Sequence, residues 1–481
     1  MSQVTAMDNI PLELLRKILL EVKWDLLSHL HEPGPKTSWV PYATVSRKWQ
    51  SIVESFTFNS LELTQMRLDV AEAYNYLTPP RLAHLRHVRF EIRFPAHDLH
   101  VSTNPEDYDD QVVFDKAIRQ ILGLLARVPR RRTPLIHLTL LIWPSREHCI
   151  PWVGYVPREK DKVFSGKLRR TYLELPADWD RNIQDLSEIS FFRVELQSLA
   201  LVFAPASINL IASRMTRLKW VDWCLCDGEK VDAQLRIRQR TAFAHTLKTL
   251  PRSIESFSLE YVRKPPKDKT FQPQGIVPPD ATSDLLSREL HHFSQRDGLR
   301  EFLLDASVDS TILWPEFQDP ESKPPTWPNM SMFHIELNDV LPSGQWIQIR
   351  DPEAEEDRFS GNWDWDDGPT SEVPGDEYEK RFDCTYNPIL FERFALAAAR
   401  AASQMPKIEE FYLTNHGFAD MGVSFVTRGF TKSFCLEFTG DPPPTPSEET
   451  LDAWRNAVNL HGMEWNVRFA YGANSYYFYH L

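Results

Sequence analysis

The sequence predicts an α/β protein in which a short helical module precedes a long body of helices and strands. Two amphipathic segments separated by a loop fill the first sixty residues. Beyond them, a short apolar motif typical of buried strands recurs eight times, often after a helix-like segment. With 481 residues, of which 42% are hydrophobic and 25% charged, the chain has the composition of a folded protein and the length of several structural units.

The first helix is expected at residues 11–22. Apolar side chains at 11, 14, 15, 18, 19 and 22 repeat at the three-and-four spacing of one helical face. Pro11 suits a helix start because nitrogens of the first turn have no intrahelical partner. The segment 31–41 holds three prolines and a glycine, which predicts a loop. A second amphipathic helix is expected over 42–56.

The recurring motif has the form hydrophobic-x-x-hydrophobic-x-hydrophobic, and its last positions alternate as in a strand with one buried face. Helix-like segments such as 114–128 precede several copies. A helix paired with a short strand is the unit of leucine-rich repeats, which stack into solenoids. The copies are Leu85/Val88/Phe90, Leu135/Leu138/Leu140, Leu196/Leu199/Leu201, Met215/Leu218/Trp220, Ile254/Phe257/Leu259, Leu299/Phe302/Leu304, Met330/Phe333/Ile335 and Ile408/Phe411/Leu413.

The spacing of the copies is irregular, since they start 19 to 78 residues apart. Regular leucine-rich repeats keep a period of about 20 to 29 residues. Residues 61–481 are therefore expected to form an irregular leucine-rich-repeat-like solenoid, or an ordinary α/β domain whose helix–strand pairs share the motif. Both alternatives predict largely parallel strands, because helices separate them. Insertions at 264–280, rich in proline, and 351–380, rich in acidic residues, predict exposed loops.

The end of the chain predicts one more helix and a closing strand. Thr445, Pro446 and Glu448 resemble a capping box with proline at the first helical position, which would open a helix over 446–460. The aromatic residues between Trp465 and Tyr479 indicate a final strand or hairpin that covers the end of the core.

Charge and hydropathy exclude several classes of function. The net charge is -13, and residues 351–380 alone carry twelve acidic and two basic side chains, which argues against a general nucleic-acid binder. No apolar run is long enough to cross a bilayer, and the first fifteen residues lack the order of a secretory signal. Five cysteines without regular spacing indicate reduced thiols. We expect a protein of the cytosol, the nucleus or both, without membrane or nucleic-acid partners.

Signals for catalysis are few. The sequence contains no Gly-x-Ser-x-Gly, Gly-x-x-x-x-Gly-Lys, Gly-x-Gly-x-x-Gly or His-Glu-x-x-His motif. Cys224 and Cys226 form the one Cys-x-Cys pair, and without a second pair nearby we expect them to pack as small hydrophobic side chains and not to hold a metal. No catalytic residue, metal site or cofactor is predicted, and we expect that the chain is not an enzyme.

Residues 1–60 carry two half-motifs in order. The first is Ile10-Pro11-x-Glu13-Leu14-Leu15-x-x-Ile18-Leu19, and the second is Val45-Ser46-Arg47-Lys48-Trp49-x-x-Ile52. Together they resemble an F-box, although the link between them, residues 24–41, is longer than usual in that family. The resemblance implies docking on an Skp-type adaptor, which bridges to a cullin-RING ubiquitin ligase. The adaptor-binding residues that it implies are Ile10, Pro11, Leu14, Ile18, Leu19, Val45, Trp49 and Ile52.

A module of this kind has a physical reason to bind a partner. About fifty residues cannot bury both faces of their helices, so an apolar stripe remains for another chain to cover. The alternative is an N-terminal helical cap that packs on the domain that follows.

The rest of the chain resembles the long C-terminal region of a group of fungal F-box proteins, a region without an assigned activity. The resemblance rests on Met-Pro-x-Ile-Glu-Glu-Phe-x-Leu from Met405 and on the form Tyr-Ala-x-Val-Ser-Arg-x-Trp from Tyr42. It implies that residues 61–481 bind a target protein.

An acidic run with two tryptophans is the most unusual local sequence. Exposed indole rings attract cations, and neighbouring carboxylates add to that attraction. The run is therefore a candidate substrate-binding element, and the alternative is that both rings pack on the body while the acidic groups stay in water. Its residues are Trp363, Asp364, Trp365, Asp366 and Asp367.

The function expected from the sequence is substrate recognition in an SCF-type (Skp-cullin-F-box) E3 ubiquitin ligase. The module would hold the adaptor, the body would bind an unknown target protein, and the chain would supply proximity and not chemistry. One alternative is an F-box scaffold or regulator that never delivers ubiquitin. Another is an enzyme whose site is assembled from scattered residues without a motif.

Overall fold

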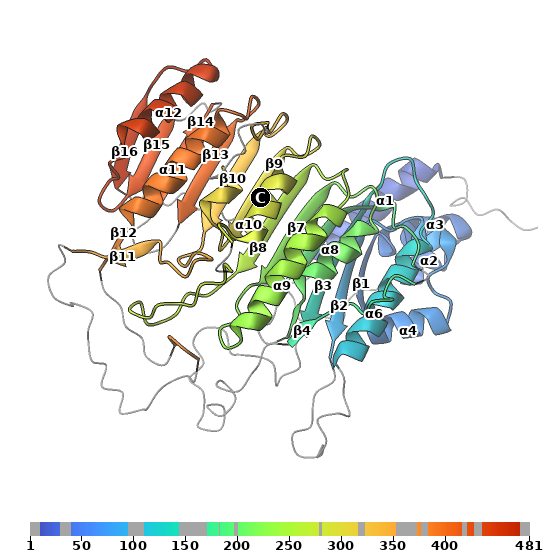
Figure 1. The fold of residues 1–481 in the computed structure, drawn as a ribbon. Coiled ribbons are helices and arrows are strands. Elements are labelled where there is room, and N and C mark those ends of the chain that lie inside the picture. Colours follow the sequence, from blue (N-terminus) through green and yellow to red (C-terminus); the bar gives the residue numbers. More distant parts are fainter. Residues whose placement is uncertain are drawn as a thin grey trace, which may run out of the picture.

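A twelve-stranded sheet forms the body, and its strands follow one another almost in chain order. In this computed structural model the helices α6, α8, α9, α10, α11 and α12 lie on one face of the sheet (Figure 1). The protein is therefore α/β, as predicted. The structure describes residues 10–28, 40–94, 110–143, 171–181, 183–196, 201–278, 281–315, 323–352, 373–376, 383–415, 421–427 and 435–471.

Neighbouring strands are parallel from β1 through β13, which confirms the expected strand direction. β14 and β15 then run antiparallel to their predecessors, and β16 lies parallel to β15. The strands of this main sheet are β1 (Ser60–Thr64), β2 (His87–Arg93), β3 (Ile136–Trp143), β5 (Ile189–Glu195), β7 (Trp220–Cys226), β8 (Ser256–Val262), β9 (Glu301–Ala306), β10 (Met332–Leu337), β13 (Glu410–Asn415), β14 (Met421–Val426), β15 (Leu436–Gly440) and β16 (Val467–Tyr471).

Two small sheets accompany the large one. β4 (Thr171–Leu173) pairs with β6 (Leu201–Phe203), and β11 (Gln348–Arg350) pairs with β12 (Cys384–Tyr386). The helices are α1 (Leu12–Ser28), α2 (Val40–Ala43), α3 (Arg47–Thr57), α4 (Gln65–Ala73), α5 (Pro79–Leu82), α6 (Asp110–Ala126), α8 (Pro205–Ser213), α9 (Ala233–Thr246), α10 (Leu285–Ser294), α11 (Pro388–Ala402) and α12 (Glu448–Leu460), with short 3-10 turns at Leu247–Thr249 and Ser310–Ile312. Within the described ranges, none of these helices has the length and apolarity needed to cross a bilayer.

The main core lies between the sheet and its covering helices. Along each strand, alternate side chains point toward the helices, because successive residues of a strand face opposite sides. In the register of the parallel strands this places Phe257, Phe302, Phe333 and Phe411 side by side, with ring centroids 5.8, 5.2 and 5.5 Å apart from one neighbour to the next. All four rings are buried and form a stacked row across the sheet.

The recurring apolar motif marks most of these strands. The copies that begin at Leu85, Ile254, Leu299, Met330 and Ile408 have all three apolar positions buried against the helices. In the copy at Leu135 the first side chain is exposed and the other two are buried.

Two copies of the motif, those that begin at Leu196 and Met215, predicted the buried strand positions wrongly in part. Trp220 points away from the helices and is 40% exposed, since the buried face of β7 is formed by Val221, Trp223 and Leu225. Leu201 lies in β6, outside the main sheet. The strand of the main sheet in that region is β5, whose Ile189, Phe192 and Val194 fit the same motif seven residues earlier.

The helix expected over 42–56 is interrupted. The first segment, α2, ends at Ala43, and Ser46 begins the second as the cap of α3, because its hydroxyl accepts a hydrogen bond from the Trp49 amide at 3.5 Å. The start of α12 also differs from the prediction. Ser447, and not Thr445, is its N-cap, with its hydroxyl accepting from the Thr450 amide at 3.2 Å. Pro446 therefore precedes the helix.

The insertion 264–280 is not simply an exposed loop. In its described part, Pro266, Pro273 and Ile276 are buried, and the Ile276 amide donates to the Pro342 carbonyl at 2.8 Å. The insertion therefore packs against residues 341–348 and contributes to the body. Of the insertion 351–380, the structure describes only 351–352 and 373–376.

Removing one ring from the stacked row is expected to destabilise the body. Phe333→Ala leaves a cavity between Phe302 and Phe411, and such changes cost about 3–5 kcal/mol in unfolding free energy. Chemical denaturation followed by tryptophan fluorescence measures the loss. Ser258→Ala, on the opposite face of β8, is the control and is expected to change little. A loss below about 1 kcal/mol for Phe333→Ala would contradict the role given to the row.

Candidate functional site

The N-terminal helices have a hydrophobic core of their own. Leu15 and Leu19 of α1 meet Ile52 and Val53 of α3, and all four are buried. This small core is separate from the main core of the sheet. If these helices were a cap on the body, their apolar side chains would join the main core. The separate small core therefore does not fit the cap alternative. We call residues 10–57 the N-terminal module.

The eight residues named from the sequence fall into three groups. Leu14, Ile18 and Val45 are 52%, 42% and 50% exposed, and Pro11 is exposed as well. Ile10 and Trp49 are half-buried against the small core. The remaining two hold the module together from inside and are not accessible from solvent; they are Leu19 and Ile52.

Helix geometry explains why Leu14 and Ile18 are exposed. Positions 14 and 18 are four residues apart in α1 and lie on one helical face, while 15 and 19 lie on the neighbouring face that packs on α3. Leu12, also 52% exposed, adds to the apolar surface and was missed in the sequence, because the half-motif leaves that position open. We call Leu12, Leu14, Ile18 and Val45 the apolar surface of the module.

Trp49 anchors the module internally. Its ring stacks on Tyr42 with centroids 6.5 Å apart, and its indole nitrogen is buried without a hydrogen-bond partner among the described residues. This ring therefore helps to position α2 on α3.

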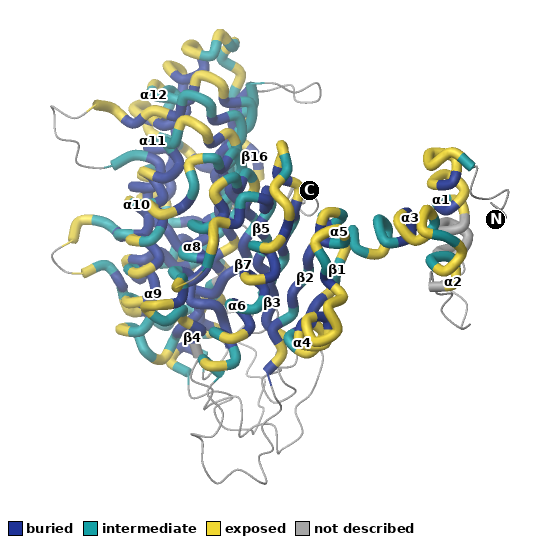
Figure 2. Tube along the Cα trace, turned by 90° about the vertical axis from the view of Figure 1, so that its right-hand side faces the viewer, coloured by how far each residue is buried: buried dark blue, intermediate teal, exposed yellow. Residues whose placement is uncertain are grey.

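The module stands away from the sheet beyond its β1 end (Figure 2). Besides the covalent connection from α3 to β1, a salt bridge joins the N-terminal module to the body. Arg81 donates to Glu54 of α3 through Nε at 3.1 Å and Nη2 at 2.8 Å, and its guanidinium lies over the Phe58 ring. Burial alone would raise the pKa of Glu54, but the hydrogen bonds from Arg81 and Gln50 lower it, so the pair is charged at neutral pH.

The acidic run Trp363–Asp367 lies outside the described residues. The described segment 373–376, within the same insertion, is attached to the body. Lys230 Nζ binds the two carboxylate oxygens of Asp376 at 2.7 and 2.9 Å, and the Asp268 amide donates to the Gly375 carbonyl at 2.8 Å. Gly375 has φ of +81° and lies so close to the Phe271 ring that a side chain would collide with it.

A buried ionic network occupies the carboxyl ends of β7, β8 and β9. Asp227, directly after β7, accepts from Arg236 Nε at 2.9 Å and Nη2 at 2.6 Å, and from Arg240 Nη1 at 2.6 Å. Arg240 Nη2 also donates to Asp284 at 2.8 Å, and Asp284 caps α10 by accepting from the Ser287 amide. These four charged side chains are nearly inaccessible to solvent.

The network satisfies its own charges. Burial alone would raise the pKa of Asp227, but the guanidiniums of Arg236 and Arg240 hold it below its ordinary value. Burial alone would lower the pKa of Arg240, and Asp227 and Asp284 raise it instead. One signal for this network was present in the sequence: two arginines lie four residues apart on a helix, and the strand before that helix is followed directly by an aspartate.

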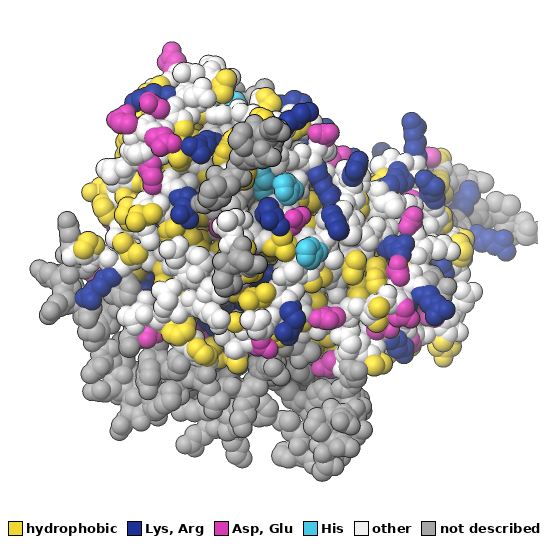
Figure 3. All heavy atoms as spheres, viewed as in Figure 1, with side chains coloured by type: hydrophobic (Ala, Val, Ile, Leu, Met, Phe, Trp, Pro, Cys, Tyr) yellow, Lys and Arg dark blue, Asp and Glu magenta, His cyan; other side chains and the backbone are white. Residues whose placement is uncertain are grey.

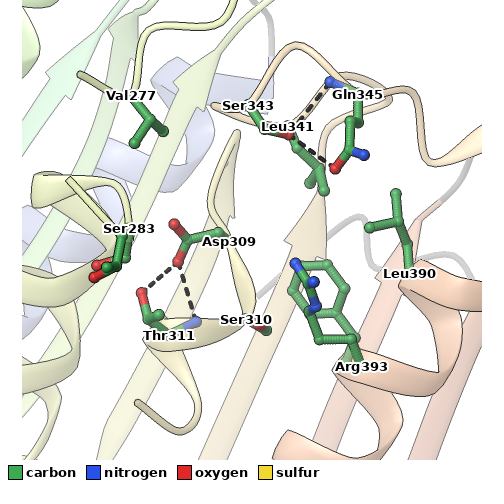
Figure 4. A pocket seen from close by; sticks show the side chains of 12 residues that line it. Val277, Ser283, Asp309, Ser310, Thr311, Leu341, Ser343, Gln345, Leu390 and Arg393 are labelled. Atoms are coloured by element: carbon green, nitrogen blue, oxygen red, sulfur yellow. Dashed lines mark hydrogen bonds between the residues drawn. The ribbon is translucent and has the colours of Figure 1, made fainter. Parts of the chain in front are cut away.

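A pocket of about 120 Å³ lies beside the network, between the 3-10 turn after β9 and α11 (Figure 4). Asp309, Ser310 and Thr311 face Leu390 and Arg393 across it. Asp309 accepts from the Thr311 amide at 3.1 Å and from the Asp284 amide at 2.7 Å, which fixes its carboxylate as a structural acceptor. Burial and the nearby Asp284 raise its pKa.

The described cysteines and surface charges do not form a further candidate site for catalysis or metal binding. Cys226 is buried with Tyr172, Val202 and Ala204, and burial raises the pKa of Cys224, so both behave as packed thiols. Among the described residues no cluster of histidine, cysteine, aspartate and glutamate is suited to a metal ion. On the helix-covered face, hydrophobic, basic and acidic side chains are interspersed (Figure 3).

Comparison with known proteins gives no family for this chain: neither a protein-family model nor a curated protein matches it.

Breaking the buried network is expected to cost far more stability than breaking an exposed ion pair. Asp227→Asn leaves Arg236 without a compensating charge and Arg240 with Asp284 alone, a loss of about 3–5 kcal/mol in unfolding free energy. Asp222→Asn is the matched control, because its partner Arg193 is partly exposed and such pairs contribute about 0–1 kcal/mol. Equal losses in chemical denaturation would contradict the role of the network.

Stability is also expected to fall between pH 6.5 and pH 4. Burial lowers the pKa of His291 to about 4, although its Nδ1 hydrogen-bonds to the Ile312 carbonyl. In the unfolded chain His291 binds a proton near pH 6.5, whereas in the folded chain it does so only near pH 4. Acidification between these values therefore favours unfolding. His291→Gln is expected to flatten the dependence of the melting temperature on pH, whereas His87→Gln, at an exposed position, keeps it. An unchanged slope in His291→Gln would contradict this.

Proposed function

We propose that the chain is the substrate-recognition subunit of an SCF-type ubiquitin ligase. The N-terminal module is an F-box that docks on an Skp-type adaptor, and the body holds a target protein. The chain itself carries no catalytic step, and it acts by bringing the target close to the ligase.

The apolar surface of the module is the observation that carries this proposal. Leu14 and Ile18 are large aliphatic side chains, exposed on one face of a helix whose other face fills a core separate from the body. Exposed apolar surface on a small helical module is typical of a binding site for another chain. The two half-motifs of the sequence make an Skp-type adaptor the partner that fits best.

We further propose that the body is an irregular leucine-rich-repeat-like array. Its support is the succession of parallel strands with helices on one face. Such an arrangement leaves the other sheet face to partners, since no element needs to cross it. Arg89, Asp222 and Glu260 lie on that face, partly or fully exposed.

The scaffold alternative shares the adaptor and differs in the outcome. A scaffold or regulator would hold the adaptor without any target becoming ubiquitinated. The motif-free enzyme would need neither adaptor nor module, so adaptor binding separates it from the other two.

Adaptor binding is expected to depend on the exposed face of α1. Leu14→Ser with Ile18→Ser removes two side chains whose burial contributes about 1.5–3 kcal/mol each, so the affinity for a purified Skp-type adaptor is expected to fall at least about a hundredfold. Isothermal titration calorimetry measures it. The fold is expected to persist, because both side chains are exposed in the free chain.

The matched control is Val112→Ser with Ile389→Ser, two exposed aliphatic residues of the body. This variant is expected to bind the adaptor like the unaltered chain. If the unaltered chain binds no adaptor, the F-box proposal fails. If it binds adaptor but a reconstituted ligase transfers ubiquitin to none of the proteins that co-purify with it, the scaffold alternative replaces the receptor.

A further inference from the structure

Four aromatic rings form a row on the face of the main sheet that points away from the helices. They lie near the amino ends of β2, β3, β5 and β7, and the parallel register places His87 beside His137, His137 beside Phe191, and Phe191 beside Trp220. The ring centroids of His87 and His137 are 4.8 Å apart, and those of His137 and Phe191 are 5.1 Å apart. We call these four residues the aromatic row.

The aromatic row is accessible to solvent. His87 is exposed, Trp220 is 40% exposed, and the two rings between them are half-buried. Burial and the neighbouring His87 lower the pKa of His137, so its ring is uncharged at neutral pH. The opposite side chains of the same strands already fill the main core, which is complete without these rings. An exposed surface of this kind with a tryptophan in it is typical of a protein-binding site.

Basic residues border the aromatic row at the amino ends of the strands. The connections that lead into β2, β3 and β7 hold eight Lys or Arg side chains and no acidic side chain; they are residues 83–86, 127–135 and 214–219. The His137 amide donates to the Arg86 carbonyl at 2.7 Å, and Arg217 Nη1 donates to the Arg131 carbonyl at 3.0 Å. These contacts hold the three connections side by side, and we call them the basic rim.

Part of the charge of the basic rim is compensated within the chain. The three basic residues of 214–219 pair with acidic neighbours, and Arg127 pairs with Glu72. Arg130 and Arg132 are exposed, and neither forms an ion pair within the described residues. The rim therefore presents positive charge to solvent, in a chain whose net charge is -13.

The row and the rim together define the chemistry of a partner. Aliphatic and aromatic side chains pack on exposed rings, and carboxylates form strong hydrogen bonds with guanidinium groups. A lysine-rich segment would be repelled by the rim, and an apolar segment without acidic residues would leave the rim unused. The partner that matches both features is an acidic polypeptide segment that carries an aromatic or aliphatic side chain.

Single-stranded RNA also combines flat rings with negative charge, but it fits this surface less well. Stacked bases need ring faces that share an orientation, whereas the planes of His87 and His137 differ by 81° and those of His137 and Phe191 by 34°. The carboxylates of Asp222 and Glu195 also lie further along the same face, where they would repel phosphates.

We infer that the aromatic row and the basic rim bind an acidic segment of a partner protein, with an apolar side chain on the rings and carboxylates at the arginines. The inference rests on the proposed function for the identification of this partner as the target of the ligase. The start of the sheet, close to the N-terminal module, is then where the target is recognised.

Short synthetic peptides test this with the full chain. The probe has a central Phe between two runs of three Glu, and fluorescence polarisation measures its binding. Three comparison peptides carry Ser runs, carry Lys runs, or have Ala in place of Phe. The probe is expected to bind at least about tenfold more tightly than each of them, because it alone matches both the rings and the rim. Its affinity is expected to fall as salt is added.

The contribution of the rings is measured with Trp220→Ser. Loss of this exposed ring is expected to weaken probe binding at least about tenfold. Trp143→Ser is the matched control, since Trp143 is 49% exposed on the same face at the other end of β3. This control variant is expected to bind the probe like the unaltered chain.

The contribution of the rim is measured with Arg130→Ser combined with Arg132→Ser. This variant is expected to bind the probe about three- to tenfold more weakly at low salt and to show a smaller salt dependence. The control with the same change of charge is Arg238→Ser combined with Arg288→Ser, two exposed positions on α9 and α10, and it is expected to keep both properties.

Three results would overturn the inference: the unaltered chain shows no preference for the probe, Trp220→Ser binds it unchanged, or a single-stranded uridine oligonucleotide binds more tightly and displaces it. Circular dichroism identifies loss of fold; should Trp220→Ser unfold, the arginine variant decides. Adaptor binding is measured on the same samples. A chain that prefers the probe but binds no adaptor refutes the F-box proposal alone, and the reverse result refutes this inference alone.

Discussion

Each strand of the main sheet buries one row of side chains against helices that lie on a single face, and the rest of the structure depends on this constraint. The stacked rings of Phe257, Phe302, Phe333 and Phe411 follow from it, because equal registers in parallel strands place equivalent residues side by side. The same constraint sends alternate polar residues to the opposite face. It also brings the carboxyl ends of β7, β8 and β9 to one edge, where the charged residues gather.

That edge combines two kinds of polar site. Asp227 binds Arg236 and Arg240 and so connects β7 to α9, and its contribution is structural. Among the described residues of this edge, Arg240 Nε, Arg263 Nη1 and Glu229 Oε2 are buried without a hydrogen-bond partner. Buried polar groups in folded proteins are usually paired, so these three atoms are exceptions at an edge that is otherwise well hydrogen-bonded.

Much of the fold could be predicted from the sequence, and the failures have identifiable physical causes. Motif copies such as Ile254/Phe257/Leu259 predicted strands correctly because their period of two matches one buried face. The region 189–201 contains two successive apolar runs with the same motif, and periodicity alone cannot decide which one joins the sheet. Ser46 is a helix-breaking cap only when its hydroxyl reaches the Trp49 amide, a local choice that an amphipathic pattern does not record. The exposed face of α1 was predicted in part, but the split between Leu14 outside and Leu19 inside required the packing of α3. The pocket that Arg263 and Glu229 both line was not predicted, because the two residues are 34 positions apart and come to one end of the sheet only through the parallel order of β7 and β8.

The connection from α3 to β1 has only two residues between the end of the helix at Thr57 and the start of the strand at Ser60. Together with the contact between Arg81 and Glu54, so short a hinge leaves little freedom of rotation. A flexible tether would let a bound target sample a wide volume, and its effective concentration at any fixed point would be low. The short joint instead sets one angle and one distance between the N-terminal module and the sheet, so two molecules bound to these two parts would be held at a fixed separation.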